Sequence, residues 1–521
     1  RSIWVTGVQT CALPISMEKN SINKASASVM DWLRDQILTR KMASPLGILL
    51  LICLSVAMAY ATVLIDAKLG VGVTAMAGVI LLCALSVLYP MFGYMVVYFV
   101  CFFLLIPPRL ANQGMASTIP TGLIPEFFSY LTLLGLLTKQ EYRKEITQQF
   151  WSNPIILWSV IMMAYYFLIL FNPAMGSKVG WFNFTRKQFS YSIFIVITYM
   201  LVNSRKSLVF VMRSWIVIST LHALYACKQQ WFGYADFEYM WLVSDPKRFD
   251  LFVNGGFVRR FGLVSDPASA GILYACSCVL VLALGLRAKE FRKRMTYFLL
   301  AVIHFLASSY TGTRTATLMI VAGMAFYCIL TLYEKRTLIF SAVFGIGLIG
   351  LLNAPIYDNM IINRLRSTFE GSNDASQMAR DLNRKMVQPY VWSHPIGGGL
   401  NTAGLVGQTY NPGHYLSMIP PDSAYMQTMM EQGSIGLALL MIFYYVVMRT
   451  GIKYFYRVKD HYIKTLYVAN LVSIFTMLVG QFSQQAIGQY PSVLYFYAGL
   501  ALLLKLHQFD GNTTKTEATE H

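Results

Sequence analysis

The chain has 521 residues, of which 56% are hydrophobic and 13% are charged, with a formal net charge of +18. Because a soluble domain of this size does not bury so large an apolar fraction, the composition predicts an all-α, polytopic membrane protein. The basic residues are spread over connecting segments, whereas nucleic-acid-binding proteins gather them in one tract or on one face. Apart from Cys11, the cysteines lie in or beside apolar segments, so we predict neither a disulfide framework nor a metal site.

The distribution of polar and apolar residues along the chain predicts a polar N-terminal part followed by two groups of membrane helices. Residues 1–16 precede Met17 and resemble a translated adapter or vector-derived segment, and residues 17–45 form a polar segment expected in the cytoplasm. Residues 46–353 are predicted to hold transmembrane helices 1–11, and residues 434–506 helices 12–14. The total is about 14 (12–14) apolar segments of the length that crosses a bilayer. The predicted spans are 46–65, 71–89, 91–106, 122–138, 153–171, 189–203, 208–227, 268–286, 295–310, 315–333, 337–353, 434–448, 465–484 and 491–506.

The charge of alternate loops predicts the orientation of the chain. Lys and Arg sum to about 24 in one set of loops and about 16 in the other, and the short, densely basic loops are expected in the cytoplasm. Both termini are then cytoplasmic, residues 354–433 form one large periplasmic loop, and residues 507–521 form a disordered cytoplasmic tail.

One long polar stretch, from Arg380 to Gly436, interrupts the apolar sequence. In it, His394 and Pro395 lead into the glycine run 397–399, and residues 420–423 lead into a helix expected to end at Gly433. A membrane protein that keeps a glycine-rich, histidine-containing segment outside the bilayer is expected to do its chemistry there. Gly398 and Gly399 either allow close backbone approach to a ligand or form a plain loop turn.

Arginines recur beside predicted outer membrane boundaries. Arg259 and Arg260 lie in the sequence RRFG, Arg314 lies in TGTR, and Arg380 and Arg384 are spaced i, i+4 on a predicted amphipathic helix. Guanidinium groups match phosphate oxygens, and they suit a lipid diphosphate at this depth. The alternatives are snorkelling to headgroups for Arg260, interfacial anchoring for Arg314 and a solvated helix face for the i, i+4 pair. The predicted apolar face of that helix contains Met378, Leu382, Met386 and Tyr390.

The motifs HPIGGGLN and PDSAYMQTMMEQGSIG, with RRFG and TGTR upstream, resemble the O-antigen ligase and polymerase superfamily of bacterial inner-membrane proteins. The motifs cover roughly residues 255–440. The resemblance implies glycosyl transfer at the periplasmic face from an undecaprenyl-diphosphate-linked glycan to a glycan or lipid-anchored acceptor, without metal, nucleotide or other cofactor. It also assigns Arg260 and Arg314 to the diphosphate. Arg259 and Arg384 are further diphosphate candidates on their charge and position alone, and membrane lipid is an expected partner of any such chain.

The family's ligase motif places His before Asn, Ser or Gln, then nine residues, then GxxG. Here the spacing from Ser423 to Gly433 fits, but Asp422 stands at the histidine position. The resemblance implies that this residue activates the acceptor hydroxyl, and a carboxylate can act as such a base. His414 is the other candidate base, and His394 could also supply this role or shape a turn. Asp422 could instead cap the following helix, because it follows two prolines and precedes a helical pattern.

Several functions remain open on the sequence alone. The missing motif histidine favours a polymerase or an exopolysaccharide assembly enzyme over a ligase. A flippase for the same lipid-linked glycan, or another transporter, is the alternative from a different class. Few ionisable residues lie at mid-span and no inverted repeat is visible, which disfavours that alternative. A purely structural envelope subunit would leave the ordered outer motifs unexplained.

Overall fold

The computed structural model describes residues 67–111, 121–254, 257–353 and 375–511, with a few single positions in 44–55 and 362–366. The predicted adapter segment, the N-terminal segment up to residue 43, almost all of span 46–65 and the tail beyond residue 511 lie outside the described residues. The chain divides into residues 1–85 and 86–521. In the first unit, helix α3 (Ala67–Leu88) exposes apolar side chains such as Val79, Ile80 and Leu81.

The described part of residues 86–521 is almost entirely helical, which confirms the predicted fold class. Its two short strands, β1 (Val253–Asn254) and β2 (Phe257–Val258), pair antiparallel with Val253 opposite Val258. The helices are α4 (Pro90–Phe103), α5 (Ile106–Ala111), α6 (Leu123–Thr138), α7 (Gln140–Arg143), α8 (Gln148–Trp151), α9 (Pro154–Leu168), η2 (Ile169–Phe171), α10 (Lys178–Leu201), α11 (Arg205–Phe232), α12 (Asp236–Val243), α13 (Pro246–Phe252), α14 (Pro267–Arg287), α15 (Phe291–Tyr310), α16 (Arg314–Leu330), α17 (Lys335–Asn353), α19 (Ala375–Ser393), α20 (Gly404–Tyr410), η3 (Tyr415–Met418), α21 (Ala424–Arg457), α22 (His461–Gly480), α23 (Ser492–Lys505) and η4 (Leu506–Phe509).

Seven helical segments in the described ranges are long and apolar enough to cross a membrane. They are Pro90–Leu110, Pro154–Phe171, Arg205–Phe232, Pro267–Arg287, Ala424–Arg457, His461–Gly480 and Ser492–Phe509. The total of about 14 spans and the periplasmic location of residues 354–433 stay predictions. Residues 507–509, which we placed in a disordered tail, belong to η4.

Polar capping groups set several helix starts that the apolar pattern places too late. Predicted span 189–203 is only the second half of α10, which begins after Ser177, whose side chain accepts from Gly180 N. Predicted span 208–227 lies inside α11, where Ser204 and Ser207 form a capping box. The hydrophobic pattern identifies the part of a helix that suits hydrocarbon, whereas hydrogen bonding of the first amides decides where the helix begins.

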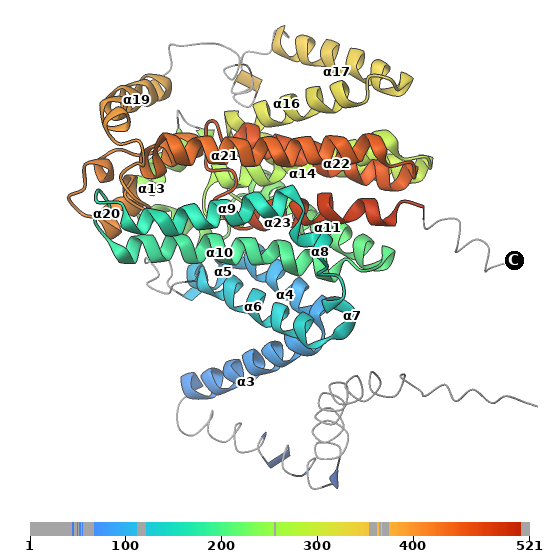
Figure 1. Cartoon of the computed structure of the whole chain (residues 1–521), viewed down its shortest axis with the longest axis horizontal. Helices are drawn as coiled ribbons and strands as arrows, with labels where there is room; N and C mark the ends of the chain where they lie inside the picture. The colour runs from blue at the N-terminus through green and yellow to red at the C-terminus, as the bar shows by residue number, and fades with distance from the viewer. Residues whose placement is uncertain are drawn as a thin grey trace, which may run out of the picture. The chain divides into compact units, whose positions relative to one another are not determined.

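The core of this unit is built on α14. This helix packs against α15, α16 and α22, while α10 packs against α23 and α9 packs against α21. Figure 1 shows α21 and α22 side by side along the bundle, with α19 and α20 at one of its ends. Buried polar side chains join the helices: Ser473 Oγ donates to Cys276 O (2.8 Å) and Asn470 Nδ2 donates to Gly499 O (2.9 Å). Such bonds between helices satisfy polar groups that find no water in an apolar interior.

Candidate functional site

Two helix starts meet around one loop, residues 481–491, which joins α22 to α23 and is called the 481–491 loop below. At the start of α21, Ala424 N donates to Gln481 O (3.1 Å). At the start of α16, Thr315 Oγ1 lies 2.7 Å from Ser483 Oγ. Segments far apart in the sequence, including the predicted outer motifs, are therefore held at the same end of the bundle.

Arg314 and Arg384 both approach this loop. Arg314 is the first residue of α16, next to Thr315, and is partly buried. The guanidinium of Arg384, on α19, lies 5.9 Å from the ring centroid of Phe482, and its Nη1 donates to Asp381 Oδ1 (3.4 Å). Two arginines that the sequence analysis assigned to a diphosphate therefore belong to segments that contact the same loop, Arg314 through its neighbour Thr315 and Arg384 through its own guanidinium.

Asp422 joins the same cluster but does not cap α21. The N-cap is Ser423, whose Oγ accepts from Met426 N (3.0 Å), so the expectation that Asp422 could be the cap is wrong. Asp422 Oδ2 instead accepts from Asn383 Nδ2 (3.2 Å), one residue before Arg384 on α19. Because the neighbouring serine takes the capping role, the Asp422 carboxylate stays available for another function.

The apolar face that the sequence predicts for α19 is not the face that packs against the core. Met378 is 59% exposed, Leu382 59% and Met386 42%, whereas Val387 and Val391 are buried. The latter pack in a cluster with Leu416, Ile419 and Met430. The buried row is displaced by one residue from the predicted row. Arg380 lies one turn before Arg384 on this helix and is partly buried.

The RRFG sequence holds two arginines with different roles. Arg259 donates from Nε to Thr311 O (3.0 Å) and from Nη2 to Thr313 Oγ1 (3.1 Å), so it clamps the turn that leads to Arg314. Arg260 donates from Nε to Gln230 Oε1 (2.8 Å), and its guanidinium lies 4.9 Å from the ring centroid of Tyr234. Arg259 is therefore a structural support of the turn, and the side chain of Arg260 has a fixed direction.

Residues that the sequence analysis did not select hold this segment in place. Gln229 pairs with both backbone groups of Gly262, since Gly262 N donates to Gln229 Oε1 (2.8 Å) and Gln229 Nε2 donates to Gly262 O (2.9 Å). Buried His222 accepts from Leu263 N through Nε2 (3.1 Å). Gly262 has φ +57°, and an added Cβ would lie 2.7 Å from His222 Cε1. Only glycine fits this position of RRFG, for backbone and steric reasons.

The two predicted histidines flank Tyr390 of α19. The His394 ring stacks on Tyr390 at 4.0 Å between centroids, and its Nδ1 lies 3.0 Å from Tyr390 O. His414 caps η3, because its Nδ1 accepts from Leu416 N (3.1 Å). Burial lowers the pKa of His414, so its neutral, accepting form is favoured. Both side chains already serve the loop structure, as expected from the turn interpretation of His394.

The glycine run approaches the backbone of α21. Gly398 N donates to Met430 O and Gly399 N donates to Glu431 O, both at 2.9 Å. An added Cβ on Gly397 would lie 2.5 Å from Glu431 O. Gly398 and Gly399 therefore allow a close approach to a helix of the same chain, and an approach to a ligand stays a prediction.

The helix that we expected to end at Gly433 continues beyond it. Gly433 has φ +70° inside α21 and marks a kink, and an added Cβ would lie 2.0 Å from Pro395 O. Ile435 N donates to the same carbonyl at 3.4 Å. The carbonyls that the kink frees from helical bonding accept from the glycine run, so the loop and the kink satisfy each other's backbone groups.

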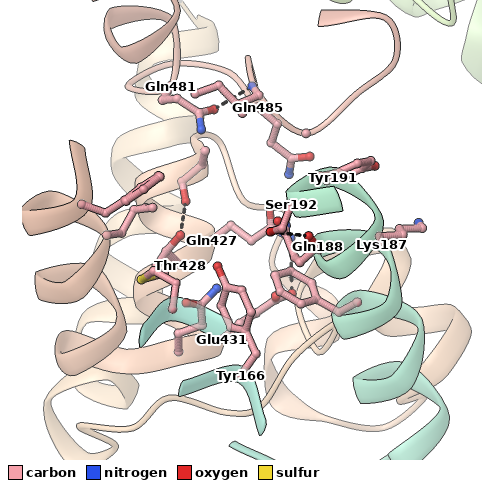
Figure 2. A pocket seen from close by; sticks show the side chains of 18 of the residues that line it. Tyr166, Lys187, Gln188, Tyr191, Ser192, Gln427, Thr428, Glu431, Gln481 and Gln485 are labelled. Atoms are coloured by element: carbon pink, nitrogen blue, oxygen red, sulfur yellow. Dashed lines mark hydrogen bonds between the residues drawn. The ribbon is translucent and has the colours of Figure 1, made fainter. Parts of the chain in front are cut away.

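A cavity of about 220 Å³ lies beside this kink, between α9, α10, α21 and the 481–491 loop. Figure 2 shows side chains of α10, among them Gln188 and Ser192, facing Gln427, Thr428 and Glu431 of α21. Lining side chains shown there also include Tyr166, Lys187, Tyr191, Gln481 and Gln485. Ala424, two residues after Asp422, lines it too. The cavity therefore begins next to the cluster of Arg314, Arg384 and Asp422.

Like Lys187, Glu431 is an ionisable residue of this cavity that the sequence analysis did not select. It is 0% exposed, and its Oε1 accepts from Ala403 N (3.2 Å) and Gln427 Nε2 (3.4 Å). Its Oε2 is buried without a hydrogen-bond partner among the described residues. An acidic residue at the start of a membrane-spanning helix was the available signal.

The described residues contain no group of three or more His, Cys, Asp or Glu side chains that could hold a metal ion. The sequence expectation of a reaction without metal or cofactor stays a prediction.

Comparison with known protein families finds that residues 299–441 match the family model described as O-Antigen ligase. The match contains Arg314, Arg384, the glycine run, both histidines, Asp422 and Glu431. It confirms the resemblance to the O-antigen ligase superfamily, and with the apolar helices it indicates a bacterial inner-membrane protein of polysaccharide ligation. A comparison with curated proteins finds no match.

Proposed function

We propose that this chain, which carries an O-antigen ligase match over residues 299–441, is a glycosyltransferase that uses an undecaprenyl-diphosphate-linked glycan as donor. It works at the periplasmic face and polymerises or ligates O-antigen or exopolysaccharide units, with both termini in the cytoplasm. The observation that supports this proposal is the gathering of Arg314, Arg384 and Asp422 around the 481–491 loop, beside a polar cavity.

In this proposal the arginines bind the donor diphosphate. Arg260 and Arg314 come from the segments that match the family's arginine motifs, Arg384 adds a third guanidinium from α19, and Arg259 fixes the turn before Arg314. As the glycosidic bond to phosphate breaks, negative charge grows on the leaving diphosphate. Guanidinium groups held in advance at that place stabilise the charge without further reorganisation.

Asp422 is the proposed proton acceptor. The acceptor hydroxyl gives its proton to the Asp422 carboxylate while its oxygen attacks the anomeric carbon, and the diphosphate leaves with the electron pair of the broken bond. His414 is the second candidate, but its Nδ1 already accepts from Leu416 N. The role of Asp422 is supported by its place in the family motif and by Ser423 taking over the cap. As the family resemblance implies, neither metal nor nucleotide takes part.

The acceptor decides between the two enzyme types. A polymerase transfers the growing glycan to a second lipid-linked unit, whereas a ligase transfers it to a different lipid anchor. The replacement of the motif histidine by Asp422 favours polymerisation.

The test is product analysis with purified protein in liposomes that contain an undecaprenyl-diphosphate oligosaccharide. We expect longer lipid-linked glycans for a polymerase, or transfer only after a second acceptor is added for a ligase. Arg314→Ala and Asp422→Asn should each lose most of the turnover, while Glu290→Gln, at an exposed ion pair with Lys293, should keep it. Full activity of Arg314→Ala, or donor movement across the bilayer without any product, would overturn the proposal.

A further inference from the structure

Two buried oxygen atoms beside the cavity lack partners. Glu431 Oε2 and Gln432 Oε1 are both buried without a hydrogen-bond partner among the described residues, and both residues line the cavity. Buried polar atoms in native proteins are almost always hydrogen-bonded, because leaving them unpaired is costly. Two adjacent residues with the same deficit, on the same wall, point to a ligand that supplies the missing bonds.

The two atoms differ in what they can bind. Gln432 Oε1 is an amide oxygen and only accepts hydrogen bonds, whereas Glu431 Oε2 accepts when ionised and donates when protonated. A fully ionised phosphate brings no proton to Gln432 Oε1, whereas a sugar hydroxyl both donates and accepts and so serves both atoms. The diphosphate is therefore expected to bind the arginines at the 481–491 loop, and a different part of the substrate is expected to bind Glu431 and Gln432.

Besides Lys187 and apolar side chains, the lining includes groups that are typical of a sugar site. Gln427 and Gln485 carry amides, Ser192 carries a hydroxyl, and Tyr166 and Tyr191 add aromatic rings. Amides and hydroxyls both donate and accept, as ring hydroxyls of a sugar do. The volume of about 220 Å³ corresponds to roughly seven waters at about 30 Å³ each. It is also below the roughly 300–1,000 Å³ typical of pockets for larger ligands, which suits one pyranose unit.

We propose that this cavity is a subsite for one uncharged sugar residue of the lipid-linked glycan, with Glu431 Oε2 and Gln432 Oε1 accepting hydrogen bonds from its hydroxyl groups. The inference rests on the proposed function and adds the place where the glycan itself is recognised. Ala424 lines the cavity two residues after Asp422, so a sugar held there lies next to the proposed base. Glu431 and Gln432 act as specificity-determining residues.

The test measures binding and needs no turnover. Wild-type protein in nanodiscs is titrated with undecaprenyl diphosphate, and separately with the same lipid carrying its oligosaccharide. We expect the oligosaccharide to tighten binding about tenfold or more, the effect of one or two hydrogen bonds to a charged or buried group. Glu431→Gln keeps an oxygen for Ala403 N but turns the other oxygen into a donor, and Gln432→Met keeps the size but removes the acceptor.

Each variant should reduce the gain from the oligosaccharide to about threefold or less, while binding of the bare lipid is unchanged. Arg314→Ala should weaken both lipids alike, and Glu290→Gln should change neither. An undiminished gain in both Glu431→Gln and Gln432→Met would overturn the sugar subsite and leave the proposed function intact. Failure of the wild type to bind either lipid would overturn the proposed function. Loss of both lipids in Glu431→Gln and Gln432→Met would assign these residues a structural role and overturn the inference.

Discussion

Gly433→Ala is the most informative single change, because it attacks the contact between the glycine run and the kink in α21. At Gly433 φ is +70° and ψ is −170°, a region that essentially only glycine adopts, so alanine there costs about 1–3 kcal/mol in backbone strain. Its Cβ would also lie 2.0 Å from Pro395 O, so the loop must move away. That movement breaks the bonds from Gly398 N and Gly399 N to α21, each worth about 0.5–1.5 kcal/mol. The sum is about 2–6 kcal/mol of local stability.

Amide hydrogen exchange measures this loss at the bonds concerned. The amides of Gly398 and Gly399 should exchange roughly 30- to several-ten-thousand-fold faster in Gly433→Ala, which is the range that about 2–6 kcal/mol corresponds to. Two control variants separate the causes. Gly413→Ala shares the positive φ (+92°) but has open space around an added Cβ, and Gly345→Ala has open space and no positive φ.

We expect the Gly398 and Gly399 amides to keep their wild-type exchange rates in both controls. Equal protection of these amides in Gly433→Ala and Gly413→Ala would refute the steric argument, because it would show that the loop tolerates a Cβ at the kink.

Three further predictions concern the same region. Ser423→Ala should lower the free energy of unfolding by about 0.5–2 kcal/mol, because the helix cap is lost. Asp422→Asn should lower turnover and leave the melting temperature almost unchanged. A larger loss of stability for Asp422→Asn than for Ser423→Ala would show that Asp422 is the cap. Because burial lowers the pKa of His414, the folded state favours its neutral form and the unfolded state takes up the proton first. The stability of the folded state should therefore fall as pH drops below about 6.5. Hydrogen exchange around η3, compared at pH 7.5 and 5.5, should show lower protection at pH 5.5 in the wild type and no such difference in His414→Asn. Gln229→Leu should leave both backbone groups of Gly262 unpaired, which lowers the free energy of unfolding by about 1–3 kcal/mol for each buried group. We expect a lower unfolding temperature and weaker diphosphate binding in this variant.

The helices could be predicted because an apolar stretch of sufficient length has few alternatives in a bilayer. Helix ends could not be predicted equally well. The span expected at 434–448 is part of α21, which begins at Ala424 and ends at Arg457. The polar turn before the apolar stretch is stabilised as helix because Ser423 caps its first amides, and hydropathy does not report this.

Candidate site residues could be selected from the sequence where a charged residue lies beside a predicted membrane boundary, or where a family motif with fixed spacing identifies the position. Arg314 and Asp422 satisfied these conditions. Glu431 did not, because it lies in the helix that we expected to end at Gly433, outside the predicted span 434–448 and outside the motif positions that suggested chemistry. Only the three-dimensional contact with Ala403 N shows that Glu431 is buried, and only the packing of α9 and α10 against α21 creates the cavity. Such contacts join residues far apart in the sequence, so no local pattern records them.

The kink connects the loop to the cavity. Gly433 directly follows Glu431 and Gln432, and Tyr165 Oη donates to Gln432 O, a carbonyl at the same kink. A straight helix would bond the carbonyls of Met430 and Glu431 to amides one turn later, whereas here they accept from Gly398 and Gly399. The direction of α21 before the kink, and with it the direction of the Glu431 and Gln432 side chains, therefore depends on the docked glycine run.

A change that displaces this run should alter the cavity while leaving the arginine cluster at the 481–491 loop in place. On this argument Gly433→Ala should reduce binding of the glycan-bearing lipid more than binding of undecaprenyl diphosphate alone, and an equal loss for the two lipids would show that the kink supports the whole outer end of the bundle.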